Sequence, residues 1–196
     1  MLMQGVLCLI LCGSVGLTAL VKHVHLLNGP SLAGIRYVNG VGLKAPAGWI
    51  FQRENQGLVL FVVVEPDSQD KKGRRLIIRK EKTDPSISPE DYLESSGLFS
   101  GPIRLIPADP SANLARPITI AGLPGVMLPV RKHVVGIPFL IDPVNETDFF
   151  AASVRPSGTA VSLQLECPDE SDPQDDLELL YTVAAAMDVQ DSPTGR

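Results

Sequence analysis

Cysteine is scarce in this sequence, and its placement argues against a disulfide framework. The chain of 196 residues has three cysteines, and two of them, Cys8 and Cys12, lie in an apolar segment near its start. If that segment is removed, only Cys167 remains, and one cysteine can form neither an internal disulfide nor a CxxC metal site. We therefore interpret Cys167 as a structural residue at the end of a strand.

The common catalytic motifs are also absent from the sequence. It contains no GxxxxGK[ST] or GxGxxG phosphate-binding loop and no GxSxG nucleophile elbow. His23 and His25 lack a placed third metal ligand, and His133 lies in a basic trio typical of a solvated strand edge. We expect a protein that is not an enzyme and has no cofactor or metal, with a small enzyme of unrecognised type as the alternative.

Aromatic residues and net positive charge are in short supply as well. Aromatic residues make up 5% of the chain and the formal net charge is −5, so the bulk composition disfavours nucleic acid as a partner. The charge is unevenly placed: residues 22–165 hold 16 basic against 13 acidic residues, a net of +3, whereas residues 166–196 hold 1 against 9, a net of −8. The acidic end is typical of a solvated segment.

Residues 1–21 carry no charged side chain, and the run from Gly5 to Val21 is long enough for an export signal or a membrane anchor. Ser14 and Gly16 would permit cleavage after Gly16, although the first basic residue, Lys22, follows the run instead of preceding it. A leucine precedes each cysteine of the run, so a lipoprotein is not expected. We predict an exported, periplasmic or membrane-anchored protein. A buried segment is the alternative, and the chain would then be a cytosolic adaptor or secretion chaperone.

The rest of the chain divides by turn residues and apolar periodicity. We predict a linker over residues 22–42, a folded domain over 43–188 and a disordered tail over 189–196. Within the domain, short β-branched and alternating runs predict a series of strands. The predicted strands cover residues 49–51, 58–64, 74–83, 104–106, 116–121, 125–135, 148–154 and 159–167.

Two helices interrupt or follow these strands. Ser88 and Pro89 are a good N-cap and first residue for a short helix that ends at Gly97, and residues 122–125 form a turn later in the chain. Asp172 and Pro173 begin a final helix that continues to about Met187 and carries one apolar face. This order predicts an α+β fold in which an antiparallel sheet packs against a C-terminal helix and a short middle helix.

These elements resemble the PsbP-like fold family, which includes photosystem extrinsic proteins, a Ran-binding protein and small exported bacterial proteins. Residues 45–49 match the family's P-x-G-W opening and end in Trp49, the only tryptophan. The strand LVLFVVVEP, the helix at residues 88–93 and the I-x-I-x-G-x-P-G-V segment at 118–126 follow in the family's order. The resemblance spans residues 43–188. It implies a binding, assembly or envelope protein with no shared catalytic residues.

The densest charged feature is a basic cluster around the third predicted strand. We predict it as a possible patch for an anionic partner or lipid headgroup, with solvated edge protection of the hairpin as the alternative. The seven residues of this patch are Lys71, Lys72, Arg74, Arg75, Arg79, Lys80 and Lys82. Arg75 and Arg79 should face the same side of a strand. The predicted partner is a protein or an envelope component, with possible membrane attachment through Gly5 to Val21.

Overall fold

The computed structural model divides the chain into two units, Met1–Ser31 and Leu32–Arg196, and the description below concerns the second. The structure describes residues 32–67, 72–96, 103–107, 115–134, 148–168 and 171–190. The predicted signal or anchor and both N-terminal histidines therefore lie outside the described residues. No helix within these ranges is long and apolar enough to cross a membrane.

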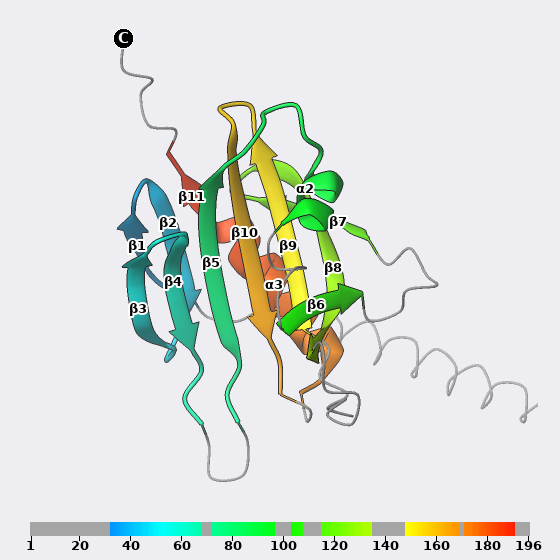
Figure 1. Ribbon diagram of the computed structural model, residues 1–196. Helices are drawn as coiled ribbons and strands as arrows, with labels where there is room; N and C mark the ends of the chain where they lie inside the picture. The colour runs from blue at the N-terminus through cyan, green and yellow to red at the C-terminus, as the bar shows by residue number, and fades with distance from the viewer. Residues whose placement is uncertain are drawn as a thin grey trace, which may run out of the picture. The chain divides into compact units, whose positions relative to one another are not determined.

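Two antiparallel sheets form the described unit (Figure 1). The small sheet has three strands in the order β1-β2-β11. Its strands are β1 (Leu32–Val38), β2 (Val41–Pro46) and β11 (Asp188–Val189). The large sheet has eight strands in the order β3-β4-β5-β10-β9-β8-β6, with β7 paired to β8. Its strands are β3 (Ile50–Gln56), β4 (Val59–Val64), β5 (Arg75–Lys82), β6 (Ile103–Pro107), β7 (Arg116–Ile120), β8 (Leu123–Val134), β9 (Asp148–Arg155) and β10 (Thr159–Glu166).

Both predicted helices are confirmed, and their caps are those expected from the sequence. Helix α2 (Pro89–Ser95) begins after Ser88, whose hydroxyl accepts a hydrogen bond from the Asp91 amide at 3.0 Å. Helix α3 (Pro173–Ala186) begins after Asp172, whose carboxylate accepts from the Gln174 amide at 2.8 Å. Helix α2 ends at Ser95 with Ser96 as its C-cap, two residues before the predicted end at Gly97.

The two helices lie on opposite sides of the large sheet (Figure 1). On the side we call the α3 face, a large apolar cluster joins α3 to both sheets, and Val161, Leu163 and Leu165 of β10 all belong to it. On the other side, a smaller cluster packs Tyr92 and Leu93 of α2 against β8, β9 and the start of β10. The α+β fold with two packed helices is therefore as predicted.

Three boundaries differ from the sequence prediction. The predicted linker over residues 22–42 is wrong from Leu32 onward, because that part forms β1 and the start of β2 around an Asn39–Gly40 turn in which both residues have positive φ. Val189, assigned to the tail, is buried in β11. The turn between β7 and β8 is Ala121–Gly122, also with positive φ, so residues 123–125 belong to β8.

Pro129 lies inside β8, where a proline interrupts hydrogen bonding between strands. Strand β8 pairs with β7 through Met127 and with β6 from Val130 onward. Leu128 and Pro129 are thus the two positions where β8 passes from one partner strand to the other. The proline therefore lies where β8 changes its partner strand.

Candidate functional site: the polar face of β5 and β10

Alternate residues of β5 and β10 form a polar surface on the side of the sheet opposite α3. The antiparallel register sets Arg75 opposite Glu166, Arg79 opposite Ser162, and Glu81 opposite Ala160. Side chains alternate along a strand, so residues of odd number on β5 and even number on β10 share one side. We define the polar face as Arg75, Arg79 and Glu81 of β5 with Ser162, Gln164 and Glu166 of β10.

A row of hydrogen bonds connects the two arginines of this face across β10. Arg79 Nη2 donates to Gln164 Oε1 at 2.9 Å, and Gln164 Nε2 donates to Glu166 Oε1 at 3.2 Å. Arg75 Nη1 in turn donates to Glu166 Oε2 at 3.2 Å. The four side chains therefore hold one another in place, and two cations are fixed on one surface as the sequence predicted.

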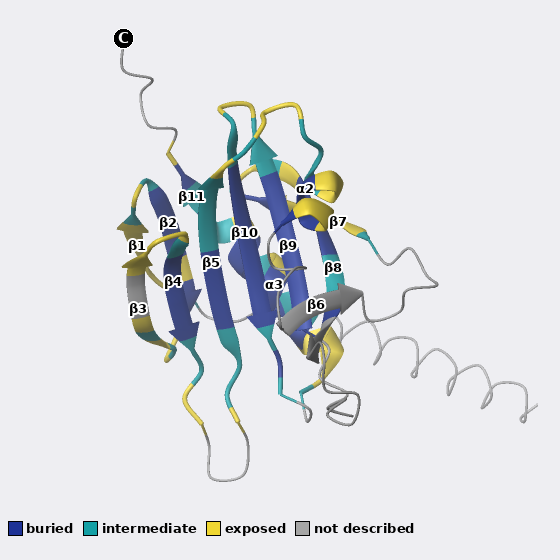
Figure 2. Ribbon diagram, in the orientation of Figure 1, coloured by how far each residue is buried: buried dark blue, intermediate teal, exposed yellow. Residues whose placement is uncertain are grey.

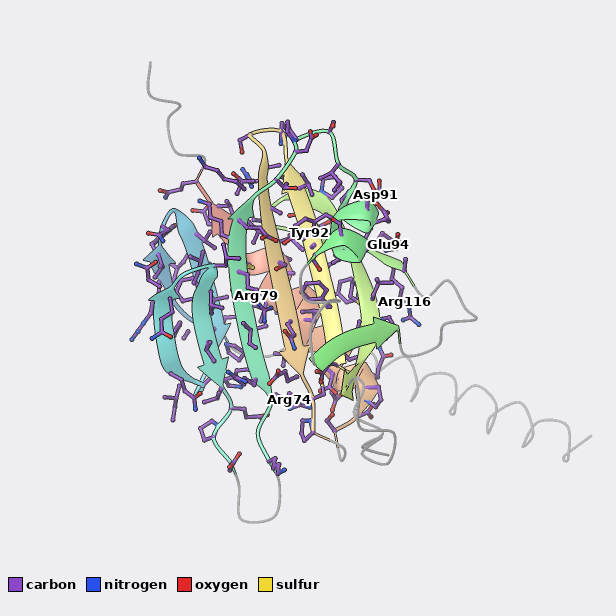
Figure 3. All side chains as sticks on the ribbon, in the orientation of Figure 1. Arg74, Arg79, Asp91, Tyr92, Glu94 and Arg116 are labelled. Atoms are coloured by element: carbon purple, nitrogen blue, oxygen red, sulfur yellow. The ribbon has the colours of Figure 1, made fainter. Side chains whose placement is uncertain are left out.

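Helix α2 closes one end of the row. The Tyr92 hydroxyl donates a short hydrogen bond to Glu81 Oε1, and both side chains are on the same side of the sheet as Arg79 (Figure 3). Burial raises the pKa of the Tyr92 hydroxyl, and the hydrogen bond to Glu81 and its negative charge act in the same direction. Tyr92 thus stays neutral and serves as a fixed donor.

Burial also leaves some donors of the face without a protein acceptor. Within the described residues, Arg79 Nη1, Arg75 Nε and Ser162 Oγ are buried atoms that have no hydrogen-bond partner. Burial lowers the pKa of the Arg79 guanidinium, while the charge of Glu166 opposes that shift. Unpaired buried donors cost free energy, about 1–3 kcal/mol each. An anionic group placed on this face would offset that cost.

The structure separates the predicted basic patch into different surroundings. Lys71 lies outside the described residues, whereas Lys72 and Lys82 are exposed. Lys80 turns to the other side of β5 and donates to the backbone carbonyl of Asn39 at 2.8 Å. Only Arg75 and Arg79, of the described patch residues, share the polar face.

Arg74, the remaining patch residue, belongs to a structural ion pair. Its Nε lies 2.5 Å from Asp176 Oδ1 and its Nη1 lies 3.2 Å from Glu65 Oε2. Asp176 is buried in the first turn of α3 and also accepts a hydrogen bond from the Ser171 hydroxyl at 2.6 Å. These contacts join the start of β5 to the start of α3, so Arg74 is committed to the fold.

Cys167 and Trp49 have structural positions, as predicted. Cys167 is buried at the end of β10, and burial together with the neighbouring charge of Asp176 raises the pKa of its thiol. A thiol held in its neutral form is a poor nucleophile. Trp49 packs against the large apolar cluster. His133 lies in β8 opposite Arg104, and its side chain is outside the described atoms.

The sequence analysis missed Ser162, Gln164, Glu166 and Tyr92 as parts of the site. The strict alternation of β10 predicts one apolar face and assigns no role to Ser162 and Gln164, which are 1% and 4% exposed. The opposite charges of Arg75 on β5 and Glu166 on β10 could have indicated that these two strands pair. The two residues are 91 positions apart in the sequence, however, so no local pattern connects them.

We compared the chain with known proteins by sequence and by structure. No protein-family model and no curated protein matches the sequence. The described fold does match solved structures. The cyanobacterial PsbP (CyanoP) from Synechocystis sp. PCC 6803 aligns with a TM-score of 0.51 and 18% identity over 82% of this chain and 94% of that one. The fold is PsbP-like. LpqN of Mycobacterium tuberculosis, involved in cell envelope biogenesis, aligns with a TM-score of 0.46 and 13% identity over 83% of this chain and 86% of that one.

The PsbP-like opening motif is a structural turn. Gly48 has a φ of +85°, which favours glycine, and the Trp49 amide donates to the Pro46 carbonyl at 3.2 Å. This turn connects the small sheet to the large one and sets Trp49 against the core. The P-x-G-W residues therefore form the turn between the two sheets, and none of them belongs to the polar face.

Proposed function

We propose that this chain is a non-enzymatic binding domain, exported or tethered to a membrane, that binds an anionic protein or envelope component through the polar face. The observation that carries the proposal is the fixed row of Arg79, Gln164, Glu166 and Arg75, in which buried donor atoms lack an acceptor among the described residues. The part of this row open to a partner carboxylate or phosphate is Arg75, whose side chain is 41% exposed.

Two titratable groups of the described residues, Tyr92 and Cys167, suit a structural role better than a catalytic one. General acid–base catalysis is most efficient when the pKa of the group lies near the working pH, and a cysteine nucleophile reacts as its thiolate. Burial raises the pKa of Tyr92 and of Cys167, which moves both values further above neutral pH. Both groups stay protonated at neutral pH, which suits packing and hydrogen bonding.

Export is proposed from the sequence, since residues 1–21 carry no charged side chain and Gly5 to Val21 is uncharged and largely apolar. The test is to express the full chain, fractionate the cells and measure the intact mass. A loss of about 1.5–2 kDa in a soluble envelope fraction supports a cleaved signal, and full mass in the membrane fraction supports an anchor. Full mass in the cytosol contradicts export and favours the cytosolic adaptor or chaperone.

The binding surface is tested with two charge-matched double variants. Arg75→Glu with Arg79→Glu reverses the polar face, and Lys72→Glu with Lys82→Glu makes the same net charge change on exposed side chains outside it. We use each chain to capture partners from an envelope extract, identify the partner, and titrate the purified partner. The first variant should weaken binding by about tenfold or more, and the control by less than about twofold.

Equal losses in both double variants contradict a specific face and indicate general electrostatic attraction. Unchanged binding in the arginine variant also contradicts the proposal. Arg79→Lys is a further test, because it keeps the charge but removes the planar fork that donates to Gln164 and to a bound carboxylate. Unfolding midpoints of all variants show whether a loss of binding follows from a loss of structure.

A further inference from the structure

Strand β1 exposes an edge of the small sheet. It is the end strand in the order β1-β2-β11, where it pairs with β2, and no strand of the described residues pairs with its other side. The five residues from Ala33 to Tyr37 are all exposed, as the yellow of β1 in Figure 2 shows. An edge of this kind presents backbone amides and carbonyls that can pair with another strand.

The side chains on one side of β1 are held over a glycine. A Cβ atom at Gly42 of β2 would lie 2.8 Å from Ile35 Cδ1 and 2.8 Å from Tyr37 Cε1, so both side chains occupy the space that this glycine leaves. The Tyr37 hydroxyl donates to Asp188 Oδ2 of β11 at 2.8 Å. Ile35 and Tyr37 nevertheless remain 37% and 49% exposed, which leaves apolar surface for a partner.

Arg36 lies on the opposite side of β1 and is held by a different contact. Its guanidinium carbon is 4.3 Å from the centre of the Phe51 ring of β3, a cation–π geometry. The edge therefore presents Ile35, Arg36 and Tyr37 in succession, which are an apolar, a cationic and an apolar side chain. Each of them contacts β2, β3 or β11, and their order determines which partner sequence can pair with the edge.

Two exposed apolar residues lie on this edge. Among the described residues, the exposed large hydrophobic side chains are those of Ile35, Tyr37, Ile50, Leu58 and Tyr181, and the first two lie on the same side of β1. The turn after β1 contacts β3, because Asn39 Nδ2 donates to Asn55 Oδ1 at 2.7 Å.

Strand β1 has only part of the usual protection of an edge strand. Proteins block edges with charged side chains, proline or a bulge, and β1 has the charged Arg36 and an irregular register near its start. The sequence LAGIRYV has neither lysine nor proline, and its irregular register lies between Leu32 and Ile35. From Ile35 to Val38 each residue has its partner on β2, so the outer edge continues in regular strand geometry.

We propose that the free edge of β1 binds an extended segment of a partner protein in which an acidic residue lies between two apolar residues. In antiparallel pairing, side chains directly opposite each other interact. The two apolar residues would lie beside Ile35 and Tyr37, and the acidic residue beside Arg36. A second copy of the chain does not satisfy this pattern, because the register that sets Ile35 opposite Tyr37 of the copy sets Arg36 against Arg36.

The test uses the full chain and a synthetic peptide of sequence Ser-Thr-Val-Glu-Val-Thr-Ser with blocked ends. This peptide should bind about fivefold more tightly than the same peptide with lysine in place of glutamate, and Arg36→Glu should reverse the preference. Lys44→Glu is the matched control. It makes the same charge change on β2, one strand further from the peptide, and should alter either affinity by less than about twofold. N-methylation of the peptide amides that face β1 should abolish binding.

Three results would overturn the proposal. One is no saturable binding of the glutamate peptide, and another is a preference that Arg36→Glu leaves unchanged. The third is concentration-dependent dimerisation of the chain that Ile35→Ser with Tyr37→Ser abolishes, since the edge would then belong to a second copy. This test is independent of the test of the polar face, because the double variant Arg75→Glu with Arg79→Glu should leave binding of the peptide to β1 unchanged.

Discussion

The two sides of strand β10 are both buried, yet they differ completely in chemistry. Toward α3, Val161, Leu163 and Leu165 are at most 1% exposed and contact only the large apolar cluster. Toward the other side, Ser162 and Gln164 are 1% and 4% exposed, and Gln164 belongs to a hydrogen-bonded row of polar groups. The same strand thus serves a core on one side and a polar network on the other.

The apolar side of β10 stabilises the fold, whereas the polar side has to be explained in another way. Burial of apolar side chains contributes about 25 cal/mol for each Å² removed from water. Buried networks of charged side chains contribute little net stability, because the cost of desolvating the charges offsets their mutual attraction. Replacing the whole network by apolar side chains is often neutral or stabilising. A polar network in the middle of a sheet is therefore poorly explained by stability alone, which supports a binding role for the polar face.

The largest expected effect is on the α3 face. Leu180 of α3 is fully buried in the apolar cluster, so Leu180→Ala should reduce the free energy of unfolding by about 3 kcal/mol. The measurement is urea unfolding followed by circular dichroism. Leu177 of the same helix is only partly buried, and Leu177→Ala is the matched control with an expected loss of less than half as much. Equal losses would show that α3 does not pack as described.

A smaller effect is expected where α2 meets the polar face. Tyr92→Phe removes the hydroxyl that donates to Glu81 and should cost about 1 kcal/mol at pH 7. The pKa of Tyr92 is raised by folding, so the neutral hydroxyl stabilises the fold below its ordinary value of 10.0 and that contribution is lost as the pH rises above it. The difference in unfolding free energy between the two proteins should therefore shrink above about pH 10.

The matched control for this change is Tyr181→Phe. Tyr181 is an exposed residue of α3 whose hydroxyl donates to the Pro117 carbonyl at 3.2 Å. Its loss should alter stability by less than about 0.5 kcal/mol at every pH. Cys167 also has a raised pKa, but it is present in all three proteins and cancels in the comparison. A constant difference between the Tyr92 variant and the unchanged chain up to pH 11 would contradict the described burial of Tyr92.

Local patterns predicted most elements but not the partners of the strands. The caps at Ser88 and Asp172 and the alternation of β10 are contained in short stretches of sequence, and the structure bears them out. The pairing of β5 with β10 depends on contacts between distant parts of the chain, which no local pattern encodes. The polar face exists only through that pairing, so the sequence indicated Arg75 and Arg79 but not the residues that fix them.

The β1–β2 hairpin was also missing from the sequence prediction, but for a different reason. An Asn-Gly pair between two runs with β-branched residues is a strong local signal for a two-residue turn. Asn39 and Gly40 have φ values of 47° and 76°, as such a turn requires. The signal was present, but the surrounding glycines and the proline were interpreted as a linker. The β1–β2 hairpin could therefore be predicted from sequence, whereas the edge position of β1 and its contacts with Phe51 and Asp188 could not.

The smallest expected effect completes the comparison of the two sides of β10. Gln164→Leu keeps the side-chain size and adds apolar surface, but it removes the acceptor of Arg79 and the donor to Glu166. Leaving Arg79 Nη2 without its acceptor costs free energy, and the added apolar surface offsets only part of that cost, so the free energy of unfolding should fall by no more than about 1 kcal/mol. The same variant should weaken partner binding through the polar face, because Arg79 loses its orientation. A loss of 3 kcal/mol with unchanged partner binding would instead make the row of polar residues a structural element. The binding role would then have to be sought elsewhere on the molecule.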